Sequence, residues 1–486
     1  MIFNSALFLF LFLPAFLIVY YIAGPKRRIW VGLAGSLLFY AWGQMFYIPL
    51  MVGVIAFNYF IGLQLGEFRT ENPGRARRLL YLGILFNVGL LAFFKLLVTY
   101  GIGVFGGLVV LLPEIVSNWL TSLVFPLGLS YVSFQVISYL VDTANGSVKP
   151  ERNFLVFCLY IFLFPKLLVG PITRYKSLAE QLSEPIPSRE MIADGIRRFI
   201  QGLAKKILIA DVLAKLVSAV FDQPSPMIMP EIAWLALLAY ALQIYFDFSG
   251  YTDMAIGLGM MMGFRFIENF NYPYISQGIS DFWRRWHISL SGWFRDYVFY
   301  PLERRRIKFM GQALNLMLVF LLTGLWHGVT LTYILWGLLH GLFMVLESLF
   351  PGRLLQKVFR PLRHLYALGA ILLTWLVFRS PSTGFALEFL ARLFGNLGGI
   401  NPLPFTQTAP LPFIEPSFWL AFGFGILFAL PVRPYLEQRF QRIFVNRSSL
   451  RLPLLAVHDL VLLFLLVLSI GAMASSKYLP GIYGNF

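Results

Sequence analysis

Long apolar runs separated by short basic loops recur along the whole chain, and most are long enough to cross a bilayer as helices. The runs are continuous rather than alternating in polarity, which favours helices over the strands of a barrel. Single spans are predicted at residues 1–23, 29–43, 47–65, 79–98, 119–140, 154–170, 233–248, 364–378, 419–430 and 452–474. A piece upstream of residue 119 is predicted to be re-entrant or interfacial.

The run at residues 311–350 is too long for one crossing. Basic residues flank it, Lys308 before and Arg353 after, so both ends are predicted to face the cytoplasm. About 40 residues at about 1.5 Å each give roughly 60 Å, or about two bilayer thicknesses. The run is therefore predicted to cross twice, with His327 in the turn. The total becomes about 11 to 12 transmembrane helices, with re-entrant or interfacial pieces.

The basic loops also predict the orientation. Lys26, Arg27 and Arg28 follow the first span, and an arginine cluster at residues 69–78 follows the third, so both loops face the cytoplasm. The N-terminus and the tail at 475–486 then lie outside the cytoplasm. The first run has no basic n-region and no small-residue cleavage site, so we interpret it as a span and not as a signal peptide.

The segment 281–308 is the most charged part of the chain. Its arginines and lysine are interleaved with Trp283, Trp286 and Trp293. This mixture is typical of a helix that lies at the membrane interface with its aromatic side chains at headgroup depth. We expect one interfacial helix here, with His287 within it.

Composition agrees with this picture. The chain is 58% hydrophobic and only 13% charged, with a mean hydropathy of +0.73. Its net charge of +16 comes from clusters of basic residues in the loops, which set the topology. No nucleic-acid partner is therefore expected, and membrane lipid is the expected surrounding partner. The single cysteine, Cys158, excludes an internal disulfide and cysteine metal clusters. The fold class is an all-α integral membrane protein.

Five histidines are the natural candidates for proton transfer. In GLWHGVT, His327 sits between two apolar helices, and flanking glycines permit a tight turn. It is either a general base or a core histidine hydrogen-bonded across helices. By itself, His287 is more typical of packing or headgroup contact. The remaining three are interpreted as structural or surface residues, namely His340, His364 and His458.

Other catalytic schemes lack their motifs. The chain has no GxSxG elbow, so no α/β-hydrolase triad is expected, and no Walker A sequence, so no ATP hydrolysis is expected. It has no HExxH and no zinc-type Cys/His spacing, so no metal is expected. Two acidic residues, Asp247 and Asp253, lie in YFDFSGYTDMAIG. They are candidates to line a channel or cap a helix, and a proton relay is the alternative.

Several long motifs together resemble the membrane-bound O-acyltransferase family, in its bacterial alginate and polysaccharide O-acetylating branch. They are SDFWRRWHISLSGWFRDYVF with GLWHG about 40 residues later, YFDFSGYTDMAIGLGMMMGFRFIENFNYPYIS, FPLGLSYVSFQVISYLVD, FPKLLVGPITRY, QGLAKKILIAD and the opening FLFLFLPAFLIVYY. The likeness covers residues 1–350, which we take as the core unit. Residues 351–486 share only the hydropathy pattern and form a unit of C-terminal helices and tail. The segment YPLERRRIKF differs from the corresponding segment of alginate subunits, so the identity of the acetylated polymer stays open.

The resemblance implies a mechanism. It makes His327 the essential catalytic histidine and His287 the second catalytic position, with cytoplasmic acetyl-CoA as donor and no metal. A helix bundle around a central channel follows, with His327 near mid-membrane at its neck and Trp326 as a further lining candidate. Cationic groups suit the donor's phosphates. The candidates are Arg284, Arg285, Arg295, Lys205 and Lys206.

The resemblance also implies transfer to the outer face of the bacterial inner membrane. Tyr483, in the tail KYLPGIYGNF, is a candidate acyl relay. The final transfer to a polysaccharide requires an extracytoplasmic partner, a serine-hydrolase-like acetyltransferase that this chain does not contain. On composition alone, a transporter or flippase of an acyl carrier or lipid-linked glycan fits as well, and a scaffold for an envelope complex is a third possibility.

Overall fold

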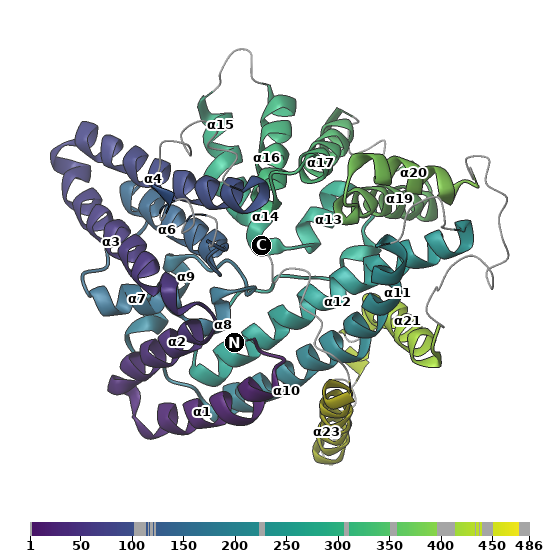
Figure 1. The fold of residues 1–486 in the computed structure, drawn as a ribbon. Coiled ribbons are helices and arrows are strands. Elements are labelled where there is room, and N and C mark those ends of the chain that lie inside the picture. Colours follow the sequence, from purple (N-terminus) through teal and green to yellow (C-terminus); the bar gives the residue numbers. More distant parts are fainter. Residues whose placement is uncertain are drawn as a thin grey trace.

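The computed structural model describes residues 2–101, 123–222, 229–305, 311–349, 357–395, 414–432 and 451–475, with a few positions between 113 and 120 and between 434 and 439. These residues form helices and connecting loops, with no β-strand among them. The predicted all-α fold class is confirmed. Figure 1 shows the long helix α12 (Pro230–Met262) running between the N-terminal helices and the C-terminal ones.

The N-terminal group consists of η1 (Phe8–Phe12), α1 (Leu13–Ile22), η2 (Pro25–Arg27), α2 (Arg28–Gln44), η3 (Met45–Tyr47), α3 (Ile48–Glu71), α4 (Pro73–Tyr100), α6 (Leu129–Ala144), α7 (Phe154–Phe162), α8 (Phe164–Leu167) and α9 (Tyr175–Ser183). A second long helix consists of α10 (Arg189–Ala204), the π-turn η5 (Lys205–Ala210) and α11 (Asp211–Phe221), and it packs along α12. The rest comprises η7 (Pro273–Ile275), α13 (Ile279–Arg285), α14 (Ile288–Phe294), η8 (Arg295–Phe299), α15 (Tyr300–Arg305), α16 (Gln312–His327), α17 (Leu331–Leu349), α19 (Arg360–Arg379), α20 (Thr383–Leu393), α21 (Pro416–Ala429) and α23 (Arg451–Ser475).

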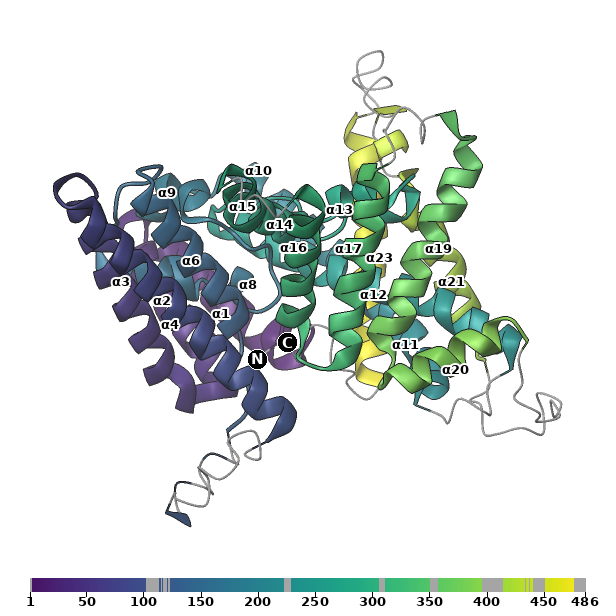
Figure 2. The same cartoon turned by 90° about the horizontal axis from the view of Figure 1, so that it is seen from above.

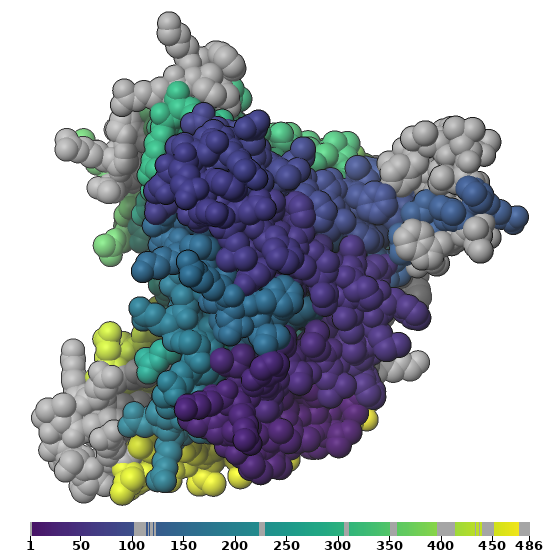
Figure 3. All heavy atoms as spheres, turned by 90° about the vertical axis from the view of Figure 1, so that its left-hand side faces the viewer, coloured from purple at the N-terminus to yellow at the C-terminus, as the bar shows by residue number. Residues whose placement is uncertain are grey.

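The outer surface of this bundle is apolar. Six helical stretches in the described residues are long and apolar enough to cross a membrane, and shorter apolar helices include α16 and α21. Large apolar side chains are exposed on the N-terminal helices that dominate the face in Figure 3, among them Phe10, Phe46 and Leu85. Exposed apolar side chains together with helices of this length are typical of contact with lipid, so the protein is a multi-pass membrane protein.

The span predicted at 154–170 is wrong as a single helix. Asn153 caps α7 by accepting a hydrogen bond from the backbone N–H of Leu155 at 3.0 Å, but α7 ends after nine residues. Leu163 takes an extended ψ of 104°, and the four-residue helix α8 then begins at Phe164, with Pro165 in its first turn. A nine-residue helix is about 14 Å long, which is too short to cross the bilayer. The apolar run conceals this break because its backbone polar groups are satisfied inside the protein.

The single interfacial helix predicted at 281–308 is also wrong. The chain instead forms α13, α14, η8 and α15, and the first break falls at Trp286 and His287. His287 has a left-handed φ of 43°, which a continuous helix cannot contain. Trp283, Trp286 and Trp293 are 7%, 2% and 5% exposed, so they are core residues and not headgroup anchors. The same aromatic residue types are common at membrane interfaces and in protein cores, and only tertiary contacts distinguish the two locations.

The helical hairpin predicted at 311–350 is confirmed. Helices α16 and α17 pack side by side, with the turn directly after His327 (Figure 2). Their contact uses two glycines. A Cβ added at Gly337 would collide with the carbonyl oxygen of Phe320, and one added at Gly324 with that of Tyr333. The small residues let the two backbones approach closely, as in many membrane helix pairs.

This contact predicts a stability effect. Gly337→Ala is expected to destabilise the protein by about 1 to 3 kcal/mol, because the new methyl group must push α17 away from α16. The matched control is Gly369→Ala on α19, where an added Cβ meets no heavy atom within 4 Å. Thermal unfolding in detergent measures both variants. Equal melting temperatures would contradict the proposed close contact.

Candidate active site

His327 is the last residue of α16, and its side chain is 4% exposed. Aromatic rings surround its imidazole, with ring centres at 4.7 Å for Trp326, 5.0 Å for Trp336 and 5.3 Å for Phe378. The helix ends here because Gly328 turns to an extended conformation, with φ of −177°. A side chain at Gly328 would collide with the ring of Tyr333. Packing therefore requires glycine at both positions that flank this turn, Gly324 and Gly328.

Helix α4 holds this turn from the other side. The buried Lys95 ammonium donates a hydrogen bond to the carbonyl oxygen of His327 at 3.4 Å. One helical turn further on, the hydroxyl of Tyr100 donates to the carbonyl oxygen of Val329 at 2.8 Å. A cation at the carboxyl end of a helix is favoured by the helix dipole. Lys95 therefore caps α16 and fixes the backbone that carries His327.

His287 lies between α13 and α14 and is 1% exposed. Its Nδ1 is 3.1 Å from Oδ1 of Asn269 and 3.4 Å from Oγ of Ser289. The same Oδ1 accepts hydrogen bonds from the backbone N–H of Ser289 at 3.1 Å and from its hydroxyl at 2.9 Å. Asn269 therefore holds both the imidazole and the start of α14.

These contacts fix the tautomer of His287. A backbone N–H can only donate, so the atom of Asn269 that faces it must be the oxygen. That oxygen can only accept, so Nδ1 of His287 must carry the proton. Nε2 then presents a lone pair, and it is buried with no hydrogen-bond partner among the described residues. A buried lone pair of this kind is suited to accept a proton or a hydrogen bond from a bound molecule.

Trp326 joins the two histidines. Its ring centre is 6.3 Å from that of His287 and 4.7 Å from that of His327. On its other side it stacks on Phe134 of α6 at 5.3 Å. The structure thus brings His287 close to Trp326 and His327, which follow it about 40 residues later in the sequence. Their arrangement is a buried aromatic site with imidazoles from two separate elements.

The other channel-lining candidates lie in ion pairs. The carboxylate of Asp253 pairs with Lys205 at 2.6 Å and with Arg198 at 2.7 Å. The buried ammonium of Lys206 lies 2.6 Å from Asp247 and 2.6 Å from Asp211. These pairs connect α12 with α10, η5 and α11. Lys205 and Lys206 thus already have carboxylate partners, which would compete with a donor phosphate.

Two of the three arginine candidates are paired as well. Arg285 lies 2.9 Å from Asp281, and Arg295 lies 2.9 Å from Asp296. Burial disfavours the Asp296 carboxylate, but hydrogen bonds from Arg295 and Arg174 outweigh burial and lower its pKa. Arg284 is exposed and has no hydrogen-bond or ion-pair partner within the described part of the chain. Contact with donor phosphates stays a prediction, and among these cations it suits Arg284 best.

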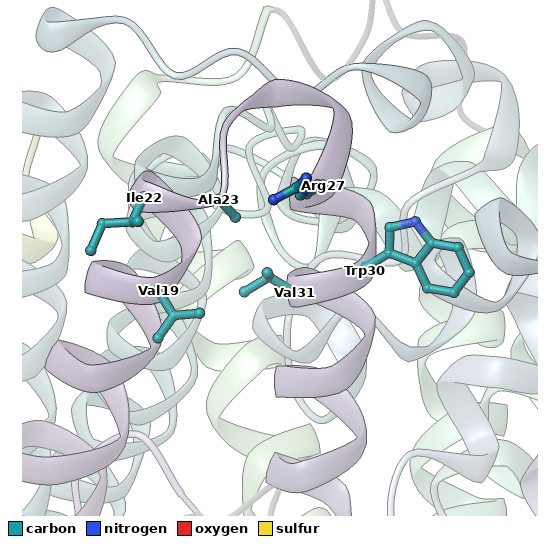
Figure 4. Close-up of a pocket in the computed structure, with 6 residues that line it drawn as sticks. All are labelled: Val19, Ile22, Ala23, Arg27, Trp30 and Val31. Carbon is teal, nitrogen blue, oxygen red and sulfur yellow. The ribbon is translucent and has the colours of Figure 1, made fainter.

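Tyr483, the candidate acyl relay, lies outside the described residues. A groove of about 520 Å³ opens at the ends of α1 and α2 (Figure 4), and it contains none of the predicted site residues. Its lining residues are Val19, Ile22, Ala23, Arg27, Trp30 and Val31. Among the described residues, no three His, Cys, Asp or Glu side chains are grouped to hold a metal ion.

Sequence reasoning missed several polar residues around the site. Asn269 orients His287, Lys95 caps α16, and the fully buried Lys166 contacts Gln135. One signal was available for the two lysines, because a charged residue inside an apolar run is costly and usually has a function. Asn269 had no such signal, since it stands among other polar residues in RFIENFNYP.

Fold and site together define a multi-pass helical membrane protein with a buried two-histidine centre. The model for the membrane-bound O-acyltransferase family matches residues 115–384. The chain belongs to this family, which confirms the resemblance seen in the sequence, and it is an acyltransferase.

Curated relatives agree with this assignment. A probable alginate O-acetylase, AlgI, of Pseudomonas aeruginosa is 40% identical over 81% of this chain and 75% of its own length. The peptidoglycan O-acetyltransferase of Helicobacter pylori is 34% identical over 82% of this chain and 81% of its own length. The teichoic acid D-alanyltransferase of Bacillus subtilis is 32% identical over 46% of this chain and 59% of its own length.

Proposed function

We propose that this acyltransferase takes an acetyl group from cytoplasmic acetyl-CoA and passes it across the inner membrane for the O-acetylation of an extracytoplasmic polysaccharide. The observation that carries the proposal is the pair of buried imidazoles whose ring centres lie 6.3 Å (His287) and 4.7 Å (His327) from that of Trp326. Relatives named for acetylation of alginate and of peptidoglycan support the acetyl group and the glycan class of acceptor.

In the proposed reaction, an acceptor hydroxyl attacks the thioester carbonyl. His327 takes the hydroxyl proton as the new C–O bond forms, and it returns that proton to the thiolate as the C–S bond breaks. The products are an acetyl ester and a free thiol, so protons and electrons balance. His287 presents Nε2 as a second lone pair in the site, able to take over that proton from His327. The aromatic surroundings exclude water, which would otherwise hydrolyse the thioester.

The acetyl group must then leave on the outer face. We propose that the attacking hydroxyl is the phenol of Tyr483, which then carries the acetyl group as an aryl ester and presents it to an extracytoplasmic, serine-hydrolase-like partner. An aryl ester is a better acyl donor than an alkyl ester, because the phenol has a pKa of about 10.

The relay predicts a selective loss. Tyr483→Phe is expected to abolish acetylation of the polymer in cells, while the purified protein still transfers the acetyl group of acetyl-CoA to an added hydroxyl acceptor. Polymer acetate content and thiol release measure the two activities. Wild-type acetate content in the variant would rule out the relay.

The proposed function is tested with purified protein and radiolabelled acetyl-CoA. Label should move to a hydroxyl acceptor or to the protein, with one free thiol released per acetyl group. A transporter or flippase would move its cargo without cleaving the thioester. The absence of thiol release above a protein-free control would therefore contradict the acetyl-CoA proposal.

A further inference from the structure

Lys166, in the short helix α8, is a buried cation that has no counter-charge among the described residues. Its side chain is 0% exposed, its Nζ donates to Oε1 of Gln135, and it lies 4.5 Å from the ring centre of Tyr160. Within the described residues, no carboxylate lies in ion-pair distance of it. Lys206, by contrast, has two aspartates at 2.6 Å. Burying an ammonium without a counter-charge costs several kcal/mol, so such a group needs a reason.

Gln135, on α6, provides a second observation. Its side chain is also 0% exposed, and its Nε2 has no hydrogen-bond partner among the described residues. With Lys166 protonated, its ammonium can only donate, so it faces the amide oxygen of Gln135. Lys166 has three N–H groups and, within the described residues, its side chain makes one conventional hydrogen bond. Two adjacent buried donor groups with spare capacity indicate that an acceptor oxygen belongs here.

Both residues are attached to the histidine site. Gln135 follows Phe134, whose ring stacks on Trp326 at 5.3 Å. Downstream of Lys166, the backbone N–H of Ile172 donates to Oγ of Ser289 at 3.0 Å. The same hydroxyl donates to the asparagine that holds His287. The pair therefore belongs to the same elements that carry the aromatic wall of the site and that position His287.

We propose that Lys166 and Gln135 form a binding subsite for a carbonyl oxygen of the acyl donor. The inference rests on the proposed acetyl transfer from acetyl-CoA, whose thioester and amide carbonyls supply the acceptor oxygens. One cationic and one neutral donor suit such an oxygen and provide nothing for a plain hydrocarbon chain. The subsite holds the donor against α6 while its thioester faces the imidazoles. Lys166 and Gln135 are positioning residues.

The sharpest test is Gln135→Glu, which is nearly isosteric and places a carboxylate where Oε1 contacts Lys166. The new ion pair satisfies the ammonium internally and competes with the donor. We expect the Kd and KM for acetyl-CoA to rise about tenfold or more, as for a lost charged hydrogen bond. The melting temperature in detergent should equal or exceed that of the wild type.

A second variant and a control complete the design. Lys166→Met removes the ammonium at similar volume and should also raise the Kd and KM about tenfold or more. Lys215→Met is the control, because Lys215 is about half exposed on the surface and 3.7 Å from Glu415. Its kinetics should match the wild type. Binding is measured with radiolabelled acetyl-CoA on the full-length purified protein.

Two results would overturn the subsite. One is a Kd within twofold of wild type in both variants. The other is a lower melting temperature of Gln135→Glu with unchanged Kd, which would make the pair structural only. Failure of the proposed function is distinguishable, since the wild type would then bind acetyl-CoA, with Gln135→Glu still weakening binding, yet transfer no acetyl group.

Discussion

His327→Ala is expected to lower acetyl transfer by about 10²–10⁴-fold, the contribution of a well-placed general base. The variant removes the imidazole at the end of α16 but keeps the backbone carbonyl that accepts from Lys95. The turn should therefore keep its position, and the loss should appear in kcat more than in the KM for acetyl-CoA. Initial rates of label transfer and of thiol release from purified protein measure the effect.

The matched control is His458→Gln, on an exposed histidine that lies 3.1 Å from Asp459 on α23. It should keep wild-type rates. Melting temperatures of both variants separate chemistry from folding, since removal of a buried ring alone lowers stability. Acetyl transfer or thioester hydrolysis that persists in His327→Ala at the wild-type rate would rule out His327 as the general base. Wild-type polymer acetylation in cells carrying that variant would favour a scaffold function instead.

The hairpin around His327 could be predicted because its determinants are local. Basic residues bound the run on both sides, its length demands two crossings, and glycines mark the turn. A titratable residue in such a run stands out against its neighbours. The site's second half has no such contrast, since His287 lies among charges and tryptophans that also suit a membrane surface.

The missed features depend on partners distant in sequence. Lys206 lies between aspartates from two helices, so its burial follows from α12 packing on η5 and not from its own segment. Lys166 follows Pro165 near the end of an apolar run, where a lysine normally marks a loop. The break between α7 and α8 instead turns that position into the core. Hydropathy records how apolar a segment is and not which side faces the protein.

His287→Ala is expected to lower kcat by about 10²-fold or more, because it removes the Nε2 lone pair beside Trp326. Asn269→Leu should lower kcat about tenfold, because the imidazole of His287 loses the oxygen that fixes its tautomer and orientation. Some loss of stability is expected too, because the backbone N–H of Ser289 loses its acceptor. Rates are therefore compared only for protein that remains folded at the assay temperature.

The double variant His287→Ala with Asn269→Leu distinguishes an indirect role from a general structural one. If Asn269 contributes to the rate through His287, its removal should cost nothing further once the histidine is gone, so the two losses should not multiply. His287→Ala with Ser291→Ala serves as the reference, because the Ser291 hydroxyl, within the described part of the chain, hydrogen-bonds only to the carbonyl oxygen of Trp286, at 3.4 Å. Multiplicative losses in the Asn269 pair would show that the asparagine supports the site independently, and the tautomer argument would then fail.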